Sequence, residues 1–156
     1  MLVRVVRRLA LEEIHNRIEA FEKKFSMSFE ELEELYLAKR ATGMIANVYF
    51  EWADLVHAYR GYMESGEFDY TVEETRDLSL REMTLLTPKR LELLYSLASL
   101  QVESINHLAQ RIHRNVKNVH QDLQTLKKLD FVAFKKKGKR NIVPETLVEE
   151  ITLLIR

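Results

Sequence analysis

The residues best suited to chemistry lie on one helical pattern in the last third of the chain. Between Val116 and Leu129, the side chains of Lys117, Asn118 and Gln121 fall opposite an apolar stripe. Amide side chains can form paired hydrogen bonds with adenine, and lysine can reach the acceptors of guanine. These three residues are therefore candidates for reading base edges. The stripe that the pattern predicts to be buried consists of Val116, Val119, Leu123 and Leu126.

Five cations follow this helix within the six residues Lys135–Arg140. The run contains Gly138 and lies between two β-prone segments, residues 131–134 and 141–143, a pattern typical of a hairpin. Taken alone, such a basic loop is more often a solvated turn. After the helical pattern above, it suits a phosphate backbone, because the cations would otherwise repel one another. The candidate phosphate contacts are Arg114, Lys128, Lys136, Lys137, Lys139 and Arg140.

Three capping residues predict the helices that position these side chains. Thr87 precedes a proline at a first helical position, Ser104 precedes a short amphipathic segment, and Asn115 precedes the polar-faced helix. The first of these helices is expected to end near Leu100. Its apolar residues at helical spacing are Leu91, Leu94, Tyr95 and Ala98.

The segments LAQR (108–111), NVKNVHQDL (115–123) and LKKLDFV (126–132) resemble archaeal and bacterial winged-helix transcriptional regulators of the MarR/ArsR-like kind. The resemblance covers residues 87–145. It implies that residues 116–129 form the recognition helix, that residues 131–143 form the wing, and that the protein regulates transcription as a dimer on double-stranded DNA. These regulators usually have glycine where this chain has Asp130, because that position often adopts a left-handed conformation.

The whole chain is accordingly predicted to be mainly α with a small β wing. We expect a winged helix-turn-helix domain over residues 87–156 and an acidic α-helical extension over residues 1–86. Residues 1–86 hold 11 Lys or Arg against 17 Asp or Glu, whereas residues 87–156 hold 13 against 7. A basic half is what a nucleic-acid binder needs, while an acidic half is repelled by phosphate. For residues 145–156 the pattern allows a helix or a strand.

The acidic extension has a helical pattern throughout. Ser28, with Glu31 three residues later, has the pattern of a capping box, so a helix is expected to begin there. A longer helix is predicted from about Gly43 to Glu64, with Trp52 in the middle of a broad apolar stripe. Because such a stripe is commonly covered by a second copy, we expect a homodimer whose contacts lie in residues 1–80.

A second likeness leaves other functions open. Residues 25–32, FSMSFEEL, followed by Glu51 and Trp52, are similar to toxin-binding stretches of small archaeal antitoxins. A capped amphipathic hairpin gives the same residues for structural reasons alone. The alternatives to a regulator are thus an antitoxin-like DNA-binding protein whose N-terminal helices bind a toxin, and a winged-helix module that binds proteins.

Enzymatic functions find little support in the sequence. The chain has no cysteine, which excludes disulfides, thiolate zinc sites and cysteine nucleophiles. The nearest approach to a metal site is Glu51, Asp54 and His57, but residues spaced by three drift around a helix. We expect no catalytic residue, metal or cofactor. The apolar run in residues 1–8 is too short for a signal peptide or a membrane span, so the expected location is cytoplasmic.

Overall fold

The computed structural model describes residues 1–66 and 70–156, and the chain divides into two compact units. One unit joins residues 1–8 to residues 71–156, and the other comprises Leu9–Tyr70. This division differs from the expected boundary after residue 86. The reason is that residues 2–8 form a strand that pairs with residues 71–77 on one side and with residues 148–153 on the other.

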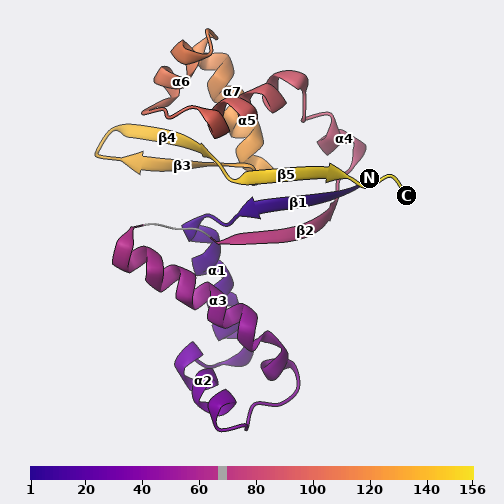
Figure 1. Cartoon of the computed structure of the whole chain (residues 1–156), viewed down its shortest axis with the longest axis vertical. Helices are drawn as coiled ribbons and strands as arrows, with labels where there is room; N and C mark the ends of the chain where they lie inside the picture. Colours follow the sequence, from indigo (N-terminus) through magenta and orange to yellow (C-terminus); the bar gives the residue numbers. More distant parts are fainter. Residues whose placement is uncertain (67–69) are drawn as a thin grey trace. The chain divides into compact units, whose positions relative to one another are not determined.

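The first unit combines a three-stranded antiparallel sheet, a two-stranded hairpin and helices α4 to α7 (Figure 1). The strand order of the larger sheet is β2-β1-β5, and the hairpin is β3-β4. Its strands are β1 (Leu2–Arg8), β2 (Thr71–Asp77), β3 (Val132–Lys137), β4 (Asn141–Thr146) and β5 (Val148–Leu153). Its helices are α4 (Leu80–Met83), α5 (Pro88–Ser99), α6 (Ile105–Arg111) and α7 (Val116–Lys128).

The core of this unit joins one face of the larger sheet to the helices. Val3 and Val5 of β1 are fully buried, and they belong to the same apolar cluster as the inward faces of α5, α6 and α7. Alternation along β1 is what a half-buried strand requires. The largest helical and loop contributors to the cluster are Leu93, Leu94, Leu97, Leu108, Leu123, Leu126 and Phe131.

The sequence-based prediction of a mainly α, winged helix-turn-helix fold is wrong. Of the described residues, 54% are helical and 21% are in strands, which form antiparallel sheets of three and two strands, so the fold is mixed α/β. The prediction that residues 1–86 are helical throughout fails at β1 and β2. Residues 148–153, left open between helix and strand, form β5.

Strand β2 escaped prediction because two of its three inward-facing side chains, Glu74 and Arg76, are charged. Arg7 of β1 is 2% exposed, and its Nε donates a hydrogen bond to Glu74 Oε1 of β2 at 2.5 Å. Arg76, further along β2, contacts the same carboxylate oxygen through Nη2 at 3.3 Å. A strand that buries a carboxylate against arginines shows no alternation of apolar residues, which is the signal that sequence reading depends on.

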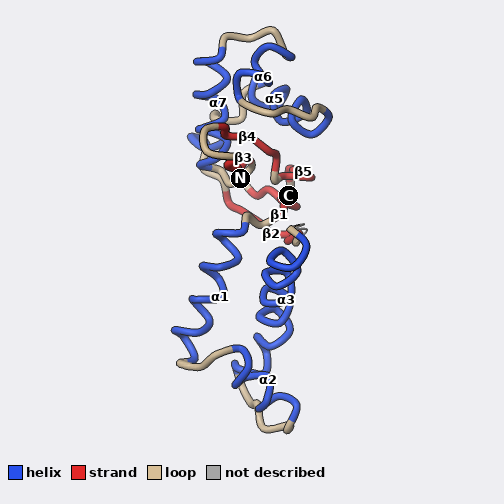
Figure 2. Tube along the Cα trace, turned by 90° about the vertical axis from the view of Figure 1, so that its left-hand side faces the viewer, coloured by secondary structure: helices blue, strands red, loops and turns tan. Residues whose placement is uncertain are grey.

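The second unit consists of α1 (Leu11–Phe25), α2 (Phe29–Leu37) and α3 (Met44–Ser65), with α1 lying alongside α3 (Figure 2). The predicted start of α2 is confirmed, since Ser28 Oγ accepts a hydrogen bond from Glu31 N at 3.2 Å. Trp52 is fully buried and stacks on Phe21, with ring centroids 5.3 Å apart. The middle of the apolar stripe is therefore covered by the chain's own helices. No helix in the described residues is both long and apolar enough to cross a membrane.

Candidate nucleic-acid interface

Helix α7 begins where the sequence predicts. Asn115 Oδ1 accepts hydrogen bonds from Lys117 N at 2.9 Å and from Asn118 N at 3.4 Å, which satisfies two of the unpaired donors of the first turn. The predicted buried stripe is confirmed at Val119, Leu123 and Leu126. Val116 departs from it, being 43% exposed, because it lies in the first turn beyond the edge of the core. The cap thus holds Lys117 and Asn118 at the exposed start of the helix.

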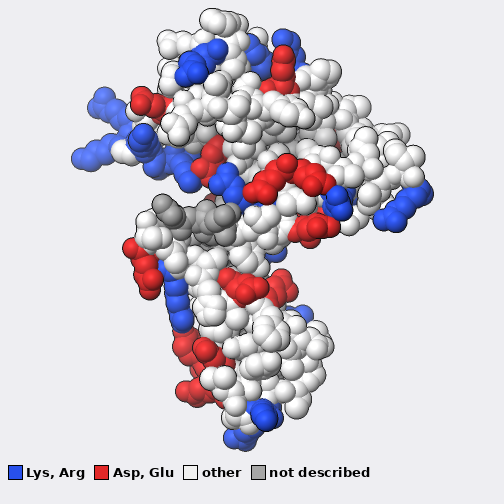
Figure 3. All heavy atoms as spheres, viewed as in Figure 1, with Lys and Arg blue, Asp and Glu red and all other residues white. Residues whose placement is uncertain are grey.

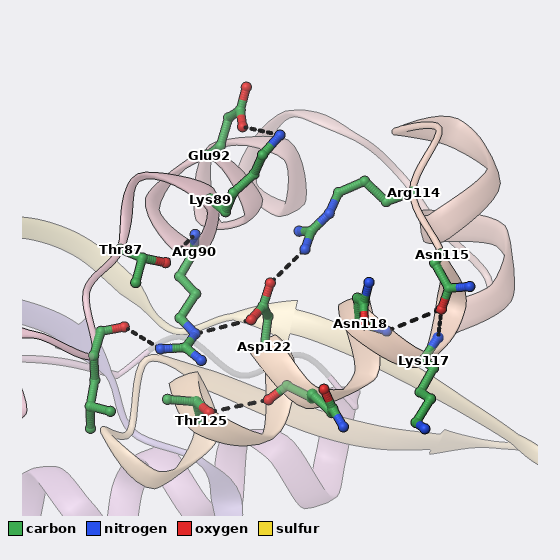
Figure 4. A network of polar contacts seen from close by, with 12 residues as sticks. Thr87, Lys89, Arg90, Glu92, Arg114, Asn115, Lys117, Asn118, Asp122 and Thr125 are labelled. Carbon is green, nitrogen blue, oxygen red and sulfur yellow. Dashed lines mark hydrogen bonds and ion pairs between the residues drawn. The ribbon is translucent and has the colours of Figure 1, made fainter.

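Asp122 fixes the rotation of α7 against its neighbours. Its Oδ1 accepts a hydrogen bond from Arg90 Nε of α5 at 3.0 Å, and its Oδ2 accepts one from Arg114 Nη2 at 2.6 Å (Figure 4). The three side chains are 15 to 21% exposed. Arg114, a predicted phosphate contact, lies in this network, where it shares the single carboxylate of Asp122 with Arg90.

The C-terminal end of α7 has a residue in the left-handed conformation, Asp130. Asp130 has a φ of 62°, in the left-handed region that ends many helices. Around it, Phe131 N donates to Leu126 O at 3.0 Å and Asp130 N donates to Lys127 O at 3.0 Å, the two bonds of a Schellman motif. Its carboxylate lies 3.8 Å from Arg76 Nη2. The helix therefore turns into β3 with the geometry that glycine would give.

The β3–β4 hairpin holds the basic run as extended strands and a short turn. The strands pair as far as Lys137 and Asn141, so they continue through the lysines that we had assigned to the loop. Gly138 in the turn has a φ of 74°, which favours glycine. Lys135 is paired with Glu145 at 2.8 Å, a partner that reading along the chain did not suggest.

The predicted phosphate-contacting residues of the hairpin are all exposed, and Lys and Arg gather at its tip (Figure 3). These residues are Lys136, Lys137, Lys139 and Arg140. Lys128, also exposed, lies apart from them at the last turn of α7.

A groove of about 620 Å³ lies between the start of α6, the exposed face of α7 and the tip of the hairpin. It brings together three predicted residues, Lys117 and Gln121 from α7 and Arg140 from the turn before β4. The predicted base-reading residue Asn118 is exposed but does not line the groove. Lys117, His120 and Gln121 thus line the groove on the α7 side, and a cationic turn borders it on another. Apolar side chains line it as well, namely Ile105, Val116 and Ile142.

The sequence did not point to most of the residues that line this groove, among them Asn106 and Ile142. Asn106 lies in the first turn of α6, and Ile142 is the second residue of β4. Neither carries a local signal, since Asn106 has the pattern of an ordinary solvated helix residue and Ile142 that of a strand residue. Their place in the groove depends on how the hairpin folds back toward α6. His120 of α7 also lines the groove.

The difference in net charge between the two parts of the chain is larger when the charges are counted over the two structural units. The unit formed by residues 1–8 and 71–156 has 18 Lys or Arg against 11 Asp or Glu, a balance of +7. The unit formed by residues 9–70 has 6 against 13, a balance of −7. The groove lies in the basic unit, whose field attracts polyanions.

The candidate metal ligands Glu51, Asp54 and His57 all lie in the part of the chain that the structure describes. There, no group of three or more His, Asp or Glu side chains lies close enough together to hold a metal ion. The spaced triple Glu51, Asp54 and His57 on α3 is therefore not gathered into a site.

Part of the chain matches a known family model. Residues 85–153, which include α5, α6, α7 and strands β3 to β5, match the family model described as HVO_A0114. This is less than half of the chain, and it contains the whole groove. Neither the curated proteins nor the solved structures contain a match to the chain.

Proposed function

We propose that the protein binds double-stranded DNA through α7 and the β3–β4 hairpin and regulates transcription. The observation that carries this proposal is the groove that Lys117, Gln121 and Arg140 share. Lysine and glutamine on an exposed helix face can pair with base edges, and arginine on a neighbouring turn can hold a phosphate.

The dimensions of the two elements fit a duplex. Helix α7 has 13 residues, a length of about 20 Å, and an α-helix with its side chains is about as wide as the major groove. Beside it, Lys136, Lys137, Lys139 and Arg140 project from the hairpin, where they can follow the phosphate backbone. The cap at Asn115 and the ion pairs of Asp122 hold the helix rigidly, as base reading requires.

The test compares two variants that remove the same charge. Replacing Lys136, Lys137, Lys139 and Arg140 with Ala removes the hairpin cations. Replacing Lys23, Lys24, Lys39 and Arg40 with Ala removes four exposed cations from the acidic unit. Binding to a fluorescent duplex is measured at several salt concentrations.

We expect the hairpin variant to lose affinity for all duplexes and to show a salt slope shallower by about 0.9 for each phosphate that the hairpin no longer neutralises. The matched variant keeps most of the slope, because its cations are outside the proposed interface. Equal losses in the two variants would remove the hairpin from the interface. A wild-type protein that binds no duplex even at low salt would leave only protein binding, as an antitoxin or an interaction module, among the functions considered.

A further inference from the structure

A second groove, of about 440 Å³, lies between α5 and β5 in the basic unit. Its lining is mostly apolar and includes Leu91 and Tyr95 of α5 and Ile151 and Leu153 of β5. Tyr95 is 79% exposed, Leu153 is 50% exposed and Leu91 is 38% exposed. These residues have the spacing of a core face, yet the chain itself leaves them in contact with solvent.

The groove runs along an open edge of the three-stranded sheet. Among the described residues β5 has one neighbouring strand, β1, because the strand order is β2-β1-β5. On its outer side Val148 N donates to Phe131 O at 3.4 Å, and no strand pairs with the residues that follow. An edge strand presents a row of free N–H and C=O groups that can pair with another strand, and natural proteins usually block such edges. The opposite edge is blocked, since β2 carries Glu73, Glu74, Arg76 and Asp77. Strand β5 carries Glu149 and Glu150, but it contains neither lysine nor proline, and Ile151 and Leu153 stand opposite the buried valines of β1.

The register shows which face of an added strand would be buried. Val3 pairs with Leu153 and Val5 pairs with Ile151, so Leu153 and Ile151 share the face of the sheet that carries the buried valines. Helix α5 covers this face, because Leu91 and Tyr95 line the same groove as β5. A strand added outside β5 would therefore extend the sheet and place its apolar side chains beneath α5.

We propose that the occupant is β5 of a second copy of this chain, paired antiparallel across a two-fold axis. When a two-fold axis relates two copies of an edge strand within one continuous sheet, the two strands run antiparallel. Each copy then contributes the same strand edge and the same exposed α5 residues to the interface. With Ile151 opposite its own copy, Glu150 lies opposite Thr152 of the second copy, so no two carboxylates face each other. Glu150 is in addition paired with Arg4 at 2.6 Å.

This dimer does not depend on the proposed DNA binding, because the two grooves share no residue. It also differs from the dimer expected from the sequence, whose basis was the stripe around Trp52. That residue is fully buried within the single chain, whereas Tyr95 is not. In the dimer, Tyr95, Leu91 and Leu153 of each copy would be buried against the other copy.

The first test measures the mass of the full-length protein by sedimentation. We expect the wild type to be a dimer and Tyr95→Glu to be a monomer that keeps its circular dichroism spectrum, since Tyr95 makes little contact within its own chain. The matched control Lys89→Glu, on an exposed face of α5 outside the groove, stays dimeric. A monomeric wild type at every concentration, or a Tyr95→Glu variant that remains dimeric, would overturn the proposal.

The second test uses the absence of cysteine from the chain. In the proposed pairing, the Cα atoms of the two Ile151 residues lie within the distance that a disulfide spans. Ile151→Cys is expected to form a disulfide-linked dimer on mild oxidation, and Thr75→Cys on the blocked edge strand β2 is not. A dimer that resists cross-linking at residue 151, or that cross-links equally at residue 75, would contradict pairing through β5.

Discussion

Asp122 Oδ2 accepts a hydrogen bond from Arg114 Nη2 at 2.6 Å, and this contact ties the residue before α7 to the middle of that helix. Arg114 looked like a phosphate contact in the sequence, because it lies just before the polar-faced helix. In the fold it closes a bridge that also includes Arg90 of α5. The aspartate thereby ties α5 and the α6–α7 turn to the middle of α7, and it sets which face of α7 is exposed.

Replacing Asp122 with Asn is expected to lower the free energy of unfolding by about 1–3 kcal/mol. The change removes a charge that two largely buried guanidinium groups share. Urea unfolding measures the effect. The control is Glu92→Gln, whose ion pair with Lys89 at 3.7 Å is about 70% exposed on both sides and should cost no more than about 0.5 kcal/mol. Equal losses in the two variants would show that the bridge adds nothing beyond surface electrostatics.

Gln121→Ala is expected to relax the sequence preference of duplex binding, because Gln121 lies in the groove beside Lys117. Loss of a paired hydrogen bond costs about 1–3 kcal/mol against the preferred base and changes non-specific affinity much less. Competition between a selected duplex and random duplexes measures the ratio of specific to non-specific affinity. Gln101→Ala, the same change at an exposed residue outside the groove, should leave the ratio unaltered. An unaltered ratio in both Gln121→Ala and Asn118→Ala would place base reading elsewhere.

Glu74 should make the stability of the sheet depend on acidic pH. Burial raises the pKa of this carboxyl, but hydrogen bonds from Arg7 and Arg76 outweigh burial and hold its pKa below the ordinary value of 4.5. A lowered pKa means that the contribution of Glu74 to stability is fully present above pH 4.5 and is lost as the pH falls through the lower value of the folded state.

Glu74→Gln is therefore expected to cost about 1–2 kcal/mol at neutral pH and progressively less in acid. Urea unfolding over a series of pH values gives the two curves, which should converge at low pH. Glu103→Gln, at an exposed position, is expected to leave the wild-type dependence in place. Parallel curves for Glu74→Gln and the wild type would mean that the titration of Glu74 is not coupled to folding.

Trp52→Ala is expected to destabilise the acidic unit by about 3–5 kcal/mol, because it removes a fully buried indole that stacks on Phe21 and Phe25. Phe50→Ala, at a residue that is 65% exposed, should cost far less. The proposed dimer contacts and the DNA groove both lie in the basic unit. The Trp52→Ala variant should therefore still sediment as a dimer and still bind duplex DNA. Loss of the dimer together with the acidic unit would restore the expectation that residues 1–80 carry the contacts.

The helix starts were determined by the sequence, because a cap depends on residues within one turn. Thr87, Ser104 and Asn115 each accept the backbone hydrogen bond that their position predicted, from Arg90, His107 and Lys117 respectively. The hairpin was predictable for a similar reason, since Gly138 lies between two β-prone runs. The exposed polar face of α7 followed from helical periodicity, and the structure keeps Lys117, Asn118 and Gln121 exposed.

Only the tertiary structure decided the larger sheet and the pairings of the charged residues. Strands β1 and β5 pair although they lie at opposite ends of the sequence. Strand β2 turns the charged Glu74 inward, toward Arg7 of β1. Neither feature leaves a periodic trace, because periodicity records burial of apolar residues and not the identity of a distant partner. For the same reason, the sequence did not predict the hydrogen bonds of Asp122 with Arg90 and Arg114 or the ion pair of Lys135 with Glu145. Local chemistry determines where an element begins and which face is polar, whereas the partners of that face depend on contacts that form only when distant segments meet.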